Sequence, residues 1–190
     1  FQRILDKERY LHNHNLYAIW NLKTYIAKKI VIENPFNSDF FIYTDAGSWR
    51  YEIFNNWPNE KFILQNLLPI LGNRIFLSQI SNKEIKKNQN IDFIQAGFFA
   101  GTTLAIKNFY NYYFNLHDKL LKKQKFVVKE QTIFNLIAME KKDILILKSF
   151  LPNCKSKIDN WFFFQVFLSN LPENHFLFCN YLKRELLSTL

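Results

Sequence analysis

The chain has 190 residues, with 25 Lys and Arg against 16 Asp and Glu, which gives a formal net charge of +9 at pH 7. Hydrophobic residues make up 48% and aromatic residues 18%, so the chain can bury a sizeable core and is not a disordered polymer. Four Gly and five Pro exclude collagen-like and low-complexity chains. The two cysteines, Cys154 and Cys179, exclude a disulfide framework and a four-thiolate zinc site.

The positive charge predicts acidic partners such as phosphates or an anionic membrane surface. The lysines form short clusters, typical of a solvated surface, and no RNP-like or zinc-finger spacing occurs, so we expect no nucleic-acid partner. No stretch reaches the roughly 18 apolar residues of a membrane span, although a peripheral membrane association stays open. The chain begins with Phe1, so the compartment also stays open between the cytoplasm and a Golgi or secretory lumen.

The elements alternate along the chain. Residues 1–15 predict a charged arm, and 16–33 an amphipathic helix whose apolar face includes Ile19, Ile26, Ala27, Ile30 and Val31. A short apolar run over 39–43 predicts a buried parallel strand, followed by a helix over 59–71 and a strand over 74–80. After a polar loop at 82–90 we expect a strand over 91–99, and then a turn framed by Gly97 and Gly101.

A long helix is predicted over 102–122, a helix over 129–139 and a strand over 143–147. The tail, 157–190, predicts two helices broken at 171–174, so 150–190 forms a helical extension. Because strands alternate with helices, we expect one α/β domain over 1–190 with a mixed, mostly parallel sheet flanked by helices.

Asp45 is the most informative position. It follows an apolar strand, so its carboxylate is expected at the carboxyl edge of the sheet, where open α/β sheets bind ligands. There it can hold a divalent cation on a diphosphate, with water and phosphate oxygens completing the shell. The structural alternative is an Asp that caps a turn.

A second candidate is the segment that contains Gln95, Ala96, Gly97, Gly101 and Thr102, interpreted as strand, tight turn and helix start. Small residues let the backbone approach a ligand, and the helix N-terminus offers free N–H groups. A plain N-cap at Thr102 is the structural alternative. The segment is not a P-loop, because no Gly-Lys-Ser/Thr follows.

A third candidate is Lys129, Glu130 and Gln131, which open a helix. Glu130 has the structural alternative of complementing the helix dipole, but a carboxylate and an amide in a cleft also suit sugar hydroxyls or a general base. Lys23 lies within a largely apolar helix face, where it either snorkels or reaches a phosphate. Hydrolase, zincin and dinucleotide-binding motifs do not occur, and His117 is interpreted as a boundary residue rather than a metal ligand.

Taken in order, these pieces resemble the HtrL/YibB family. The resemblance spans roughly 16–147 and rests on four blocks: Leu16-Tyr-Ala-Ile-Trp-Asn-Leu-Lys23 with Glu33-Asn-Pro-Phe36, Phe41-Ile-Tyr-Thr-Asp-Ala-Gly47-Ser-Trp-Arg50, Ile94-Gln-Ala-Gly-Phe-Phe-Ala-Gly-Thr102, and Lys129-Glu-Gln131 with Asn135. It implies a glycosyltransferase-like protein with the GT-A nucleotide-sugar fold, lacking part of the N-terminal nucleotide-binding unit.

The resemblance also implies roles for the site residues. Asp45 would begin the metal and nucleotide motif Asp-x-Asp, with a Mn or Mg ion as cofactor, although Gly47 stands where its second Asp would be. Lys23 would face the diphosphate with help from Arg50, Gln95 to Gly97 would line the sugar site, and Glu130 with Gln131 would lie near the acceptor. The expected activity is hexosyl or similar transfer from a nucleotide-sugar donor to a hydroxyl acceptor, most naturally a carbohydrate.

Two alternatives accompany this hypothesis. A non-catalytic carbohydrate- or nucleotide-binding relative would keep the fold and carry a degenerate metal motif at Gly47. A basic nucleic-acid-binding domain would instead show affinity that falls steeply with salt.

Overall fold

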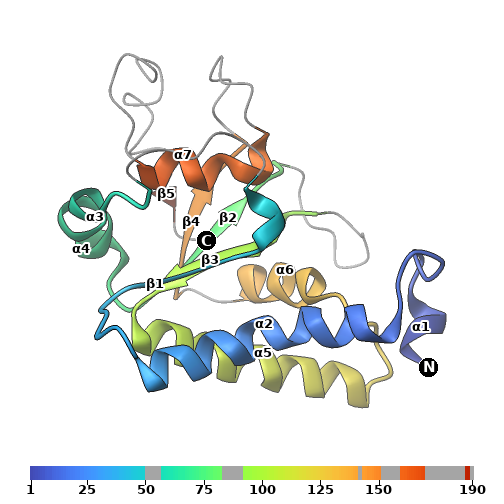
Figure 1. Ribbon diagram of the computed structural model, residues 1–190. Helices are drawn as coiled ribbons and strands as arrows, with labels where there is room; N and C mark the ends of the chain where they lie inside the picture. Colours follow the sequence, from blue (N-terminus) through green and yellow to red (C-terminus); the bar gives the residue numbers. More distant parts are fainter. Residues whose placement is uncertain (50–56, 83–91, 141–142, 151–158, 170–186, 189–190) are drawn as a thin grey trace.

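The computed structural model describes residues 1–49, 57–82, 92–140, 143–150, 159–169 and 187–188. Its centre is a five-stranded sheet with helices on both faces (Figure 1). The long helices α2 and α5, together with α6, pack against one face, and α3, α4 and α7 lie on the other side. Each face has its own hydrophobic core, so the expected α/β architecture with a mixed, helix-flanked sheet is confirmed.

The strand order is β1-β3-β2-β4-β5, for β1 (Phe41–Thr44), β2 (Ile75–Gln79), β3 (Ile94–Gly101), β4 (Ile144–Lys148) and β5 (Leu187–Ser188). Only β2 and β4 pair in parallel, and the other three pairings are antiparallel. The prediction of a mostly parallel sheet is therefore wrong. The alternation of strands and helices along the chain does not determine strand direction. Here β3 lies between β1 and β2 and is antiparallel to both.

The first strand also differs from its prediction. β1 pairs only with β3 and lies at one edge of the sheet, with all four of its residues partly exposed. A short apolar run does not distinguish a buried central strand from an edge strand, because the outer neighbour is not visible in the local sequence. The β1, β2 and β4 strands nevertheless share one direction, so their carboxyl ends lie at the same edge of the sheet.

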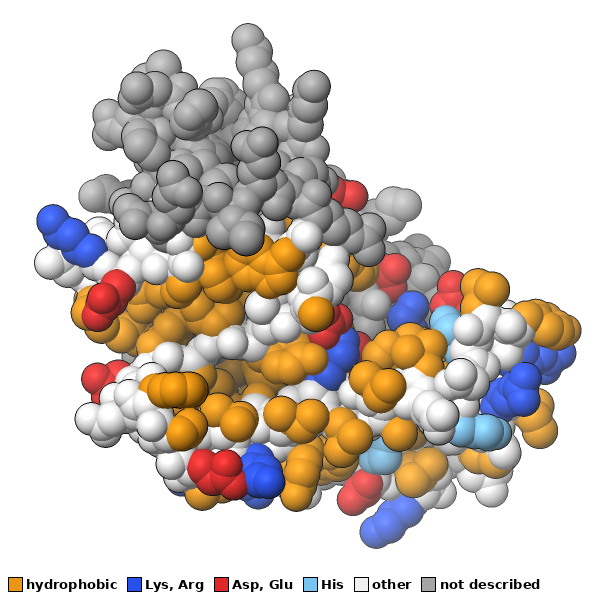
Figure 2. All heavy atoms as spheres, in the orientation of Figure 1, with side chains coloured by type: hydrophobic (Ala, Val, Ile, Leu, Met, Phe, Trp, Pro, Cys, Tyr) orange, Lys and Arg blue, Asp and Glu red, His pale blue; other side chains and the backbone are white. Residues whose placement is uncertain are grey.

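Helix α2 (His14–Glu33) begins at Asn13, whose side chain accepts a hydrogen bond from the Leu16 N–H. It ends at Asn34, which has the left-handed backbone conformation of a helix C-cap (φ 38°). Its buried face agrees with the predicted one in part, because Ala27 and Val31 are buried whereas Ile19, Ile26 and Ile30 are exposed. Figure 2, in the orientation of Figure 1, shows hydrophobic side chains on the surface over α2. The face turned to the core consists of Tyr17, Lys23, Thr24, Ala27 and Val31.

The next helical region and the two helices that follow β3 agree with the sequence. The predicted 59–71 helix consists of α3 (Glu60–Phe62), a π-helical turn (Ile63–Leu67) and α4 (Leu68–Leu71), with Pro69, which has no N–H to donate, in the first turn of α4. Helices α5 (Thr103–Lys122) and α6 (Glu130–Glu140) lie within a residue of their predicted bounds. No helix in the described part of the chain is long and apolar enough to cross a membrane.

Two further predictions fail. No turn interrupts the segment from Gly97 to Gly101, because β3 continues through both glycines to the N-cap of α5. In the tail, α7 (Phe163–Ser169) is helical, preceded by a short 3-10 turn (Asn160–Phe162), but Leu187 and Ser188 form β5 where a helix was predicted. The predicted break at 171–174 lies outside the described residues, as do Cys154 and Cys179. The remaining helices, α1 (Gln2–Leu5) and a 3-10 turn (Ala46–Ser48), are short.

Candidate functional site

One buried ammonium joins two carboxylates at the carboxyl edge of the sheet. Lys23 Nζ lies 2.8 Å from Asp45 Oδ2 and 2.6 Å from Glu130 Oε1. The side chains of Lys23 and Glu130 are 7% and 6% exposed, whereas that of Asp45 is 39% exposed. Three residues from α2, the end of β1 and the start of α6 thus converge, and Asp45 is the member that solvent or a ligand can reach. We call this cluster the Lys23 site.

The position of Asp45 is set by its two neighbouring strands. Its backbone N–H extends the β1–β3 ladder by donating to the Gly97 carbonyl at 2.9 Å, and its Oδ1 accepts a hydrogen bond from the Tyr43 hydroxyl at 2.9 Å. A Cβ atom built on Gly97 would lie 2.9 Å from Asp45 Oδ2. Because real Cβ contacts are longer, only glycine at position 97 leaves this carboxylate its place beside Lys23.

Burial and charge set the ionisation of the site. Burial raises the pKa of Glu130, an effect that the Lys23 charge opposes and the Asp45 charge reinforces. Burial also raises the pKa of Tyr43, and the negative charge and hydrogen bond of Asp45 add to the increase, so Tyr43 stays a neutral hydroxyl donor. Tyr43 was not among the predicted site residues, but its spacing two residues before Asp45 on a strand could have indicated it.

Two side chains of α6 hold the irregular start of β3. The β2–β3 register shifts between Leu77 and Gln79, with Gln79 opposite Ile94, and the backbone N–H and C=O of Ile94 bond to side chains of α6. Gln131 Nε2 donates to the Ile94 carbonyl at 3.0 Å, and Asn135 Oδ1 accepts from the Ile94 N–H at 2.8 Å. Such irregularities redirect neighbouring side chains. Gln131 therefore anchors the strand beside the Lys23 site, and its part in the chemistry stays a prediction.

The two other predicted residues of this strand segment are buried. Gln95 is fully buried, and its side-chain Oε1 and Nε2 have no hydrogen-bond partner among the described residues. Its Nε2 lies 3.5 Å from the Cβ position built on Gly97, so the amide lies next to the Asp45 carboxylate. A buried amide without partners is costly, and it marks a place where a water molecule or ligand group would be stabilised. Ala96 packs into the hydrophobic core.

Other predicted residues lie elsewhere. Gly101 and Thr102 are at the far end of β3, about 13 Å from Gly97 at the usual rise of a strand. Thr102 is the N-cap of α5 and accepts from the Ala105 N–H. Lys129 Nζ faces Glu8 at 3.6 Å and Asp92 at 3.7 Å, away from Lys23. Arg50 lies outside the described residues.

The environment of Asp45 was tested for a divalent cation. Both of its oxygens are already engaged, Oδ2 by the Lys23 ammonium and Oδ1 by the Tyr43 hydroxyl. Gly47, the second position of the expected metal motif, adds no side-chain ligand. A Ca²⁺ or Mg²⁺ site needs several oxygens around the ion, so this arrangement does not fit a resident cation.

Among the described residues, one group of three acidic and histidine side chains lies within metal-binding distance, namely Asp6, Glu8 and His12. Asp6 Oδ2 already accepts from the Tyr17 hydroxyl at 2.6 Å and contacts His12 Nδ1 at 2.8 Å, while Oδ1 accepts from the Glu8 N–H. Burial alone would raise the pKa of Asp6, but these hydrogen bonds lower it overall. The group is thus part of a network that fixes the N-terminal arm to α2 through Tyr17 and contacts Lys129 through Glu8.

Comparison with known proteins places the chain in a family. Residues 3–169 match the family described as "Bacterial protein of unknown function (HtrL_YibB)", so the chain belongs to it. No curated protein and no solved structure matches the chain. The family's description gives no activity, and the function must be argued from the site.

Proposed function

We propose that this member of the HtrL/YibB family is a glycosyltransferase that moves a sugar from a nucleotide-diphosphate donor to a hydroxyl acceptor at the Lys23 site. The observation that carries the proposal is the convergence of Lys23, Asp45 and Glu130 at the carboxyl edge of the sheet. Ligands of open α/β sheets bind at this edge, and carboxylates accept the hydrogen bonds that sugar hydroxyls donate. A GT-A-like arrangement of the strands belongs to the same proposal.

The role proposed for each residue of the site depends on whether its side chain is exposed or buried. Asp45 is the accessible carboxylate, and it accepts a hydrogen bond from a hydroxyl of the donor sugar. Lys23 and Tyr43 orient this carboxylate through their hydrogen bonds to it, and the positive charge of Lys23 also stabilises the negative charge that develops on the departing diphosphate. Gln95 adds a buried amide beside Asp45, which stabilises a polar ligand atom or an ordered water there.

The reaction transfers one sugar and one proton. The oxygen of the acceptor hydroxyl bonds to the anomeric carbon, the bond from that carbon to the phosphate oxygen breaks, and the diphosphate leaves with the electron pair. The hydroxyl proton goes to a carboxylate. Glu130, whose pKa is raised by burial, is suited to receive it, provided that its carboxylate exchanges the Lys23 ammonium for the acceptor hydroxyl.

The proposal is tested by the release of nucleoside diphosphate from UDP-hexoses and GDP-hexoses, with and without manganese. Asp45→Asn keeps the size of the side chain and removes its charge, so we expect release to fall about a hundredfold or more. The matched control is Asp39→Asn, an exposed Asp just before β1, which should leave release unchanged. Unchanged turnover in Asp45→Asn, with circular dichroism showing the wild-type fold, would contradict the mechanism.

A second candidate is a non-catalytic relative that binds a carbohydrate or nucleotide. It is favoured by the same ion pairs, because Lys23 already neutralises the carboxylates that a metal-dependent transferase would use. A Cβ at Gly47 would meet no atom within 4 Å, so Gly47→Asp fits the fold and restores Asp-x-Asp. Metal-dependent donor hydrolysis gained in Gly47→Asp, together with none in the wild type, would support this candidate.

A further inference from the structure

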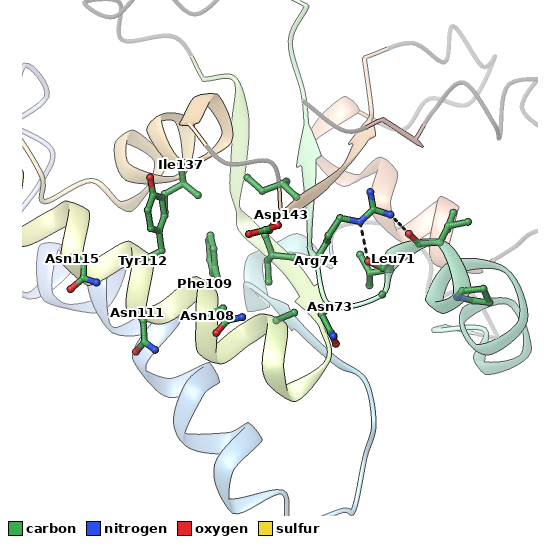
Figure 3. Close-up of a pocket in the computed structure, with 16 residues that line it drawn as sticks. Leu71, Asn73, Arg74, Asn108, Phe109, Asn111, Tyr112, Asn115, Ile137 and Asp143 are labelled. Carbon is green, nitrogen blue, oxygen red and sulfur yellow. Dashed lines mark hydrogen bonds between the residues drawn. The ribbon is translucent and has the colours of Figure 1, made fainter.

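A second possible site lies at the opposite edge of the sheet. A cavity of about 730 Å³ opens between the turn that joins α4 to β2 and the side of α5 (Figure 3). It includes Ile75 and Ile144, the first residues of β2 and β4, and none of the residues of the Lys23 site. Its volume falls within the roughly 300–1,000 Å³ of small-molecule pockets.

The floor of the cavity is apolar and closed. Leu71, Ile75, Phe109, Ile137 and Ile144 line it and are each at most 4% exposed, so their packing is complete without a ligand. A ligand would therefore lie on a preformed floor. Above this floor, the apolar surface that a ligand can reach comes from Ile70, which is 46% exposed, and from the partly exposed ring of Tyr112, and it suits the C–H groups of a sugar ring.

The wall along α5 carries three asparagines. Asn108, Asn111 and Asn115 follow one another at steps of three and four residues, so they share a face of the helix. Figure 3 shows them in a row along α5. All three are exposed, and their side chains make no hydrogen bond to any other described residue. Seven residues of helix extend about 10 Å, which is longer than one sugar ring.

The charges at the cavity balance one another. Among the described residues, its lining contains one cation and one anion, Arg74 and Asp143. The Arg74 guanidinium is already engaged, because it donates to the carbonyls of Ile70 and Leu71 at the end of α4. No surplus of either sign is left among the lining residues to select a phosphate, a sulfate or an ammonium group.

We propose that this cavity, which we call the Asn108 cavity, binds a neutral oligosaccharide. Each amide offers both an N–H donor and a carbonyl acceptor, which matches hydroxyl groups that donate and accept. Ile70 and the ring of Tyr112 take the C–H face of a sugar ring, and the row of amides follows the saccharide along α5. This binding does not depend on sugar transfer at the Lys23 site, so either proposal can fail without the other.

The test uses protein labelled with ¹⁵N at asparagine, so that the side-chain amide signals report directly on the cavity. The probes are maltotriose, cellotriose, mannotriose and triacetylchitotriose, titrated to millimolar concentration, with a heparin-derived tetrasaccharide as the charged comparison. We expect at least one neutral trisaccharide to shift the signals of Asn108, Asn111 and Asn115 saturably. Single Asn→Ala variants assign the three signals.

The triple variant Asn108→Ala/Asn111→Ala/Asn115→Ala should weaken this binding about a hundredfold, because each lost hydrogen bond contributes about fivefold. Asn66→Ala, which changes an exposed asparagine outside the cavity, should bind as the wild type does. The proposal is overturned if none of the trisaccharides shifts the three signals, if the triple variant binds unchanged, or if the sulfated tetrasaccharide binds more tightly than every neutral probe.

Discussion

The two ends of the sheet hold polar side chains in opposite ways. At the carboxyl ends of β1, β2 and β4, Lys23 and Glu130 are buried and paired, and Asp45 is the half-exposed member. At the amino ends of β2 and β4, the polar side chains that α5 contributes to the Asn108 cavity are exposed, uncharged amides above a buried apolar floor. The Lys23 site is thus part of the buried interior of the protein, whereas the asparagines of the Asn108 cavity lie on its surface.

Because of this difference, substitutions at the two ends of the sheet should have different effects on folding stability and on ligand binding. A buried charge that loses its partner leaves an uncompensated ion, and the fold bears the cost. An exposed amide that is removed leaves only water in its place, and the cost appears in ligand binding alone. We therefore expect substitutions at the Lys23 site to change stability and binding together, and those at the Asn108 cavity to change binding only.

The largest effect is expected for Lys23→Met, which keeps the length of the side chain and removes its charge. Glu130 would then be buried without its cation, so the free energy of unfolding should fall by about 3–5 kcal/mol. Denaturant unfolding measures this loss. The double variant Lys23→Met/Glu130→Gln should recover part of it, because the buried charge is then also removed. A loss below about 1 kcal/mol in the single variant would show that the ion pairs are not structural.

The next largest effect on stability is expected for alanine substitutions at two glycines of β3, Gly97 and Gly101. In Gly97→Ala the new methyl group would meet Asp45 Oδ2 at 2.9 Å, and in Gly101→Ala it would meet the Ala105 Cβ at 2.9 Å. Each should cost about 1–3 kcal/mol of unfolding free energy through overpacking. Gly97→Ala should also weaken nucleotide binding, because it displaces the carboxylate, and Gly101→Ala should leave it unchanged. Equal nucleotide affinities in the two variants would remove the assigned role of Gly97.

A smaller effect is the pH dependence that Glu130 adds. Because burial raises its pKa above the usual 4.5, the folded state holds the proton more tightly than the unfolded state. Its contribution to stability is therefore fully present below pH 4.5 and is lost as the pH rises through the raised pKa. The stability difference between the wild type and Glu130→Gln should shift against the wild type over this range. A difference that is independent of pH there would contradict the raised pKa.

The smallest effect is expected at the cavity. Asn108→Ala, Asn111→Ala and Asn115→Ala should each change the free energy of unfolding by less than about 0.5 kcal/mol, because the three side chains are exposed and unpaired among the described residues. Thermal unfolding of the three variants beside Lys23→Met measures the contrast directly. A loss of 2 kcal/mol or more in any of them would show that the amides belong to the fold rather than to a binding surface.

The sequence predicted the elements well and their pairing poorly. Periodicity located α2, α5 and α6 because regularly spaced side chains mark a helix. It could not show that β3 runs against both of its neighbours, because strand direction depends on partners that are distant in the chain. For the same reason it missed the edge position of β1 and the short pairing of β5 with β4.

At the candidate site, too, the sequence indicated individual residues but not the contacts between residues distant in the chain. Lys23, Asp45 and Glu130 were each singled out from local context, but their mutual ion pairs join residues 22 and 107 positions apart and could not be derived from spacing. The opposite error occurred at Gly101 and Thr102, which were grouped with Gly97 because they are near it in sequence. An extended strand instead carries them to the far edge of the sheet.

Calorimetry with UDP and GDP, with and without manganese, tests the central claim most directly. The account predicts saturable micromolar binding of one of the two nucleotides to the wild type and to Asp39→Asn, and its loss in Asp45→Asn. A requirement for manganese would show that the nucleotide binds as its metal complex, and binding without it would show that the side chains of the Lys23 site suffice. Binding of equal affinity in Asp45→Asn, or no binding of either nucleotide to the wild type, would contradict the assignment of the Lys23 site to a nucleotide-sugar donor.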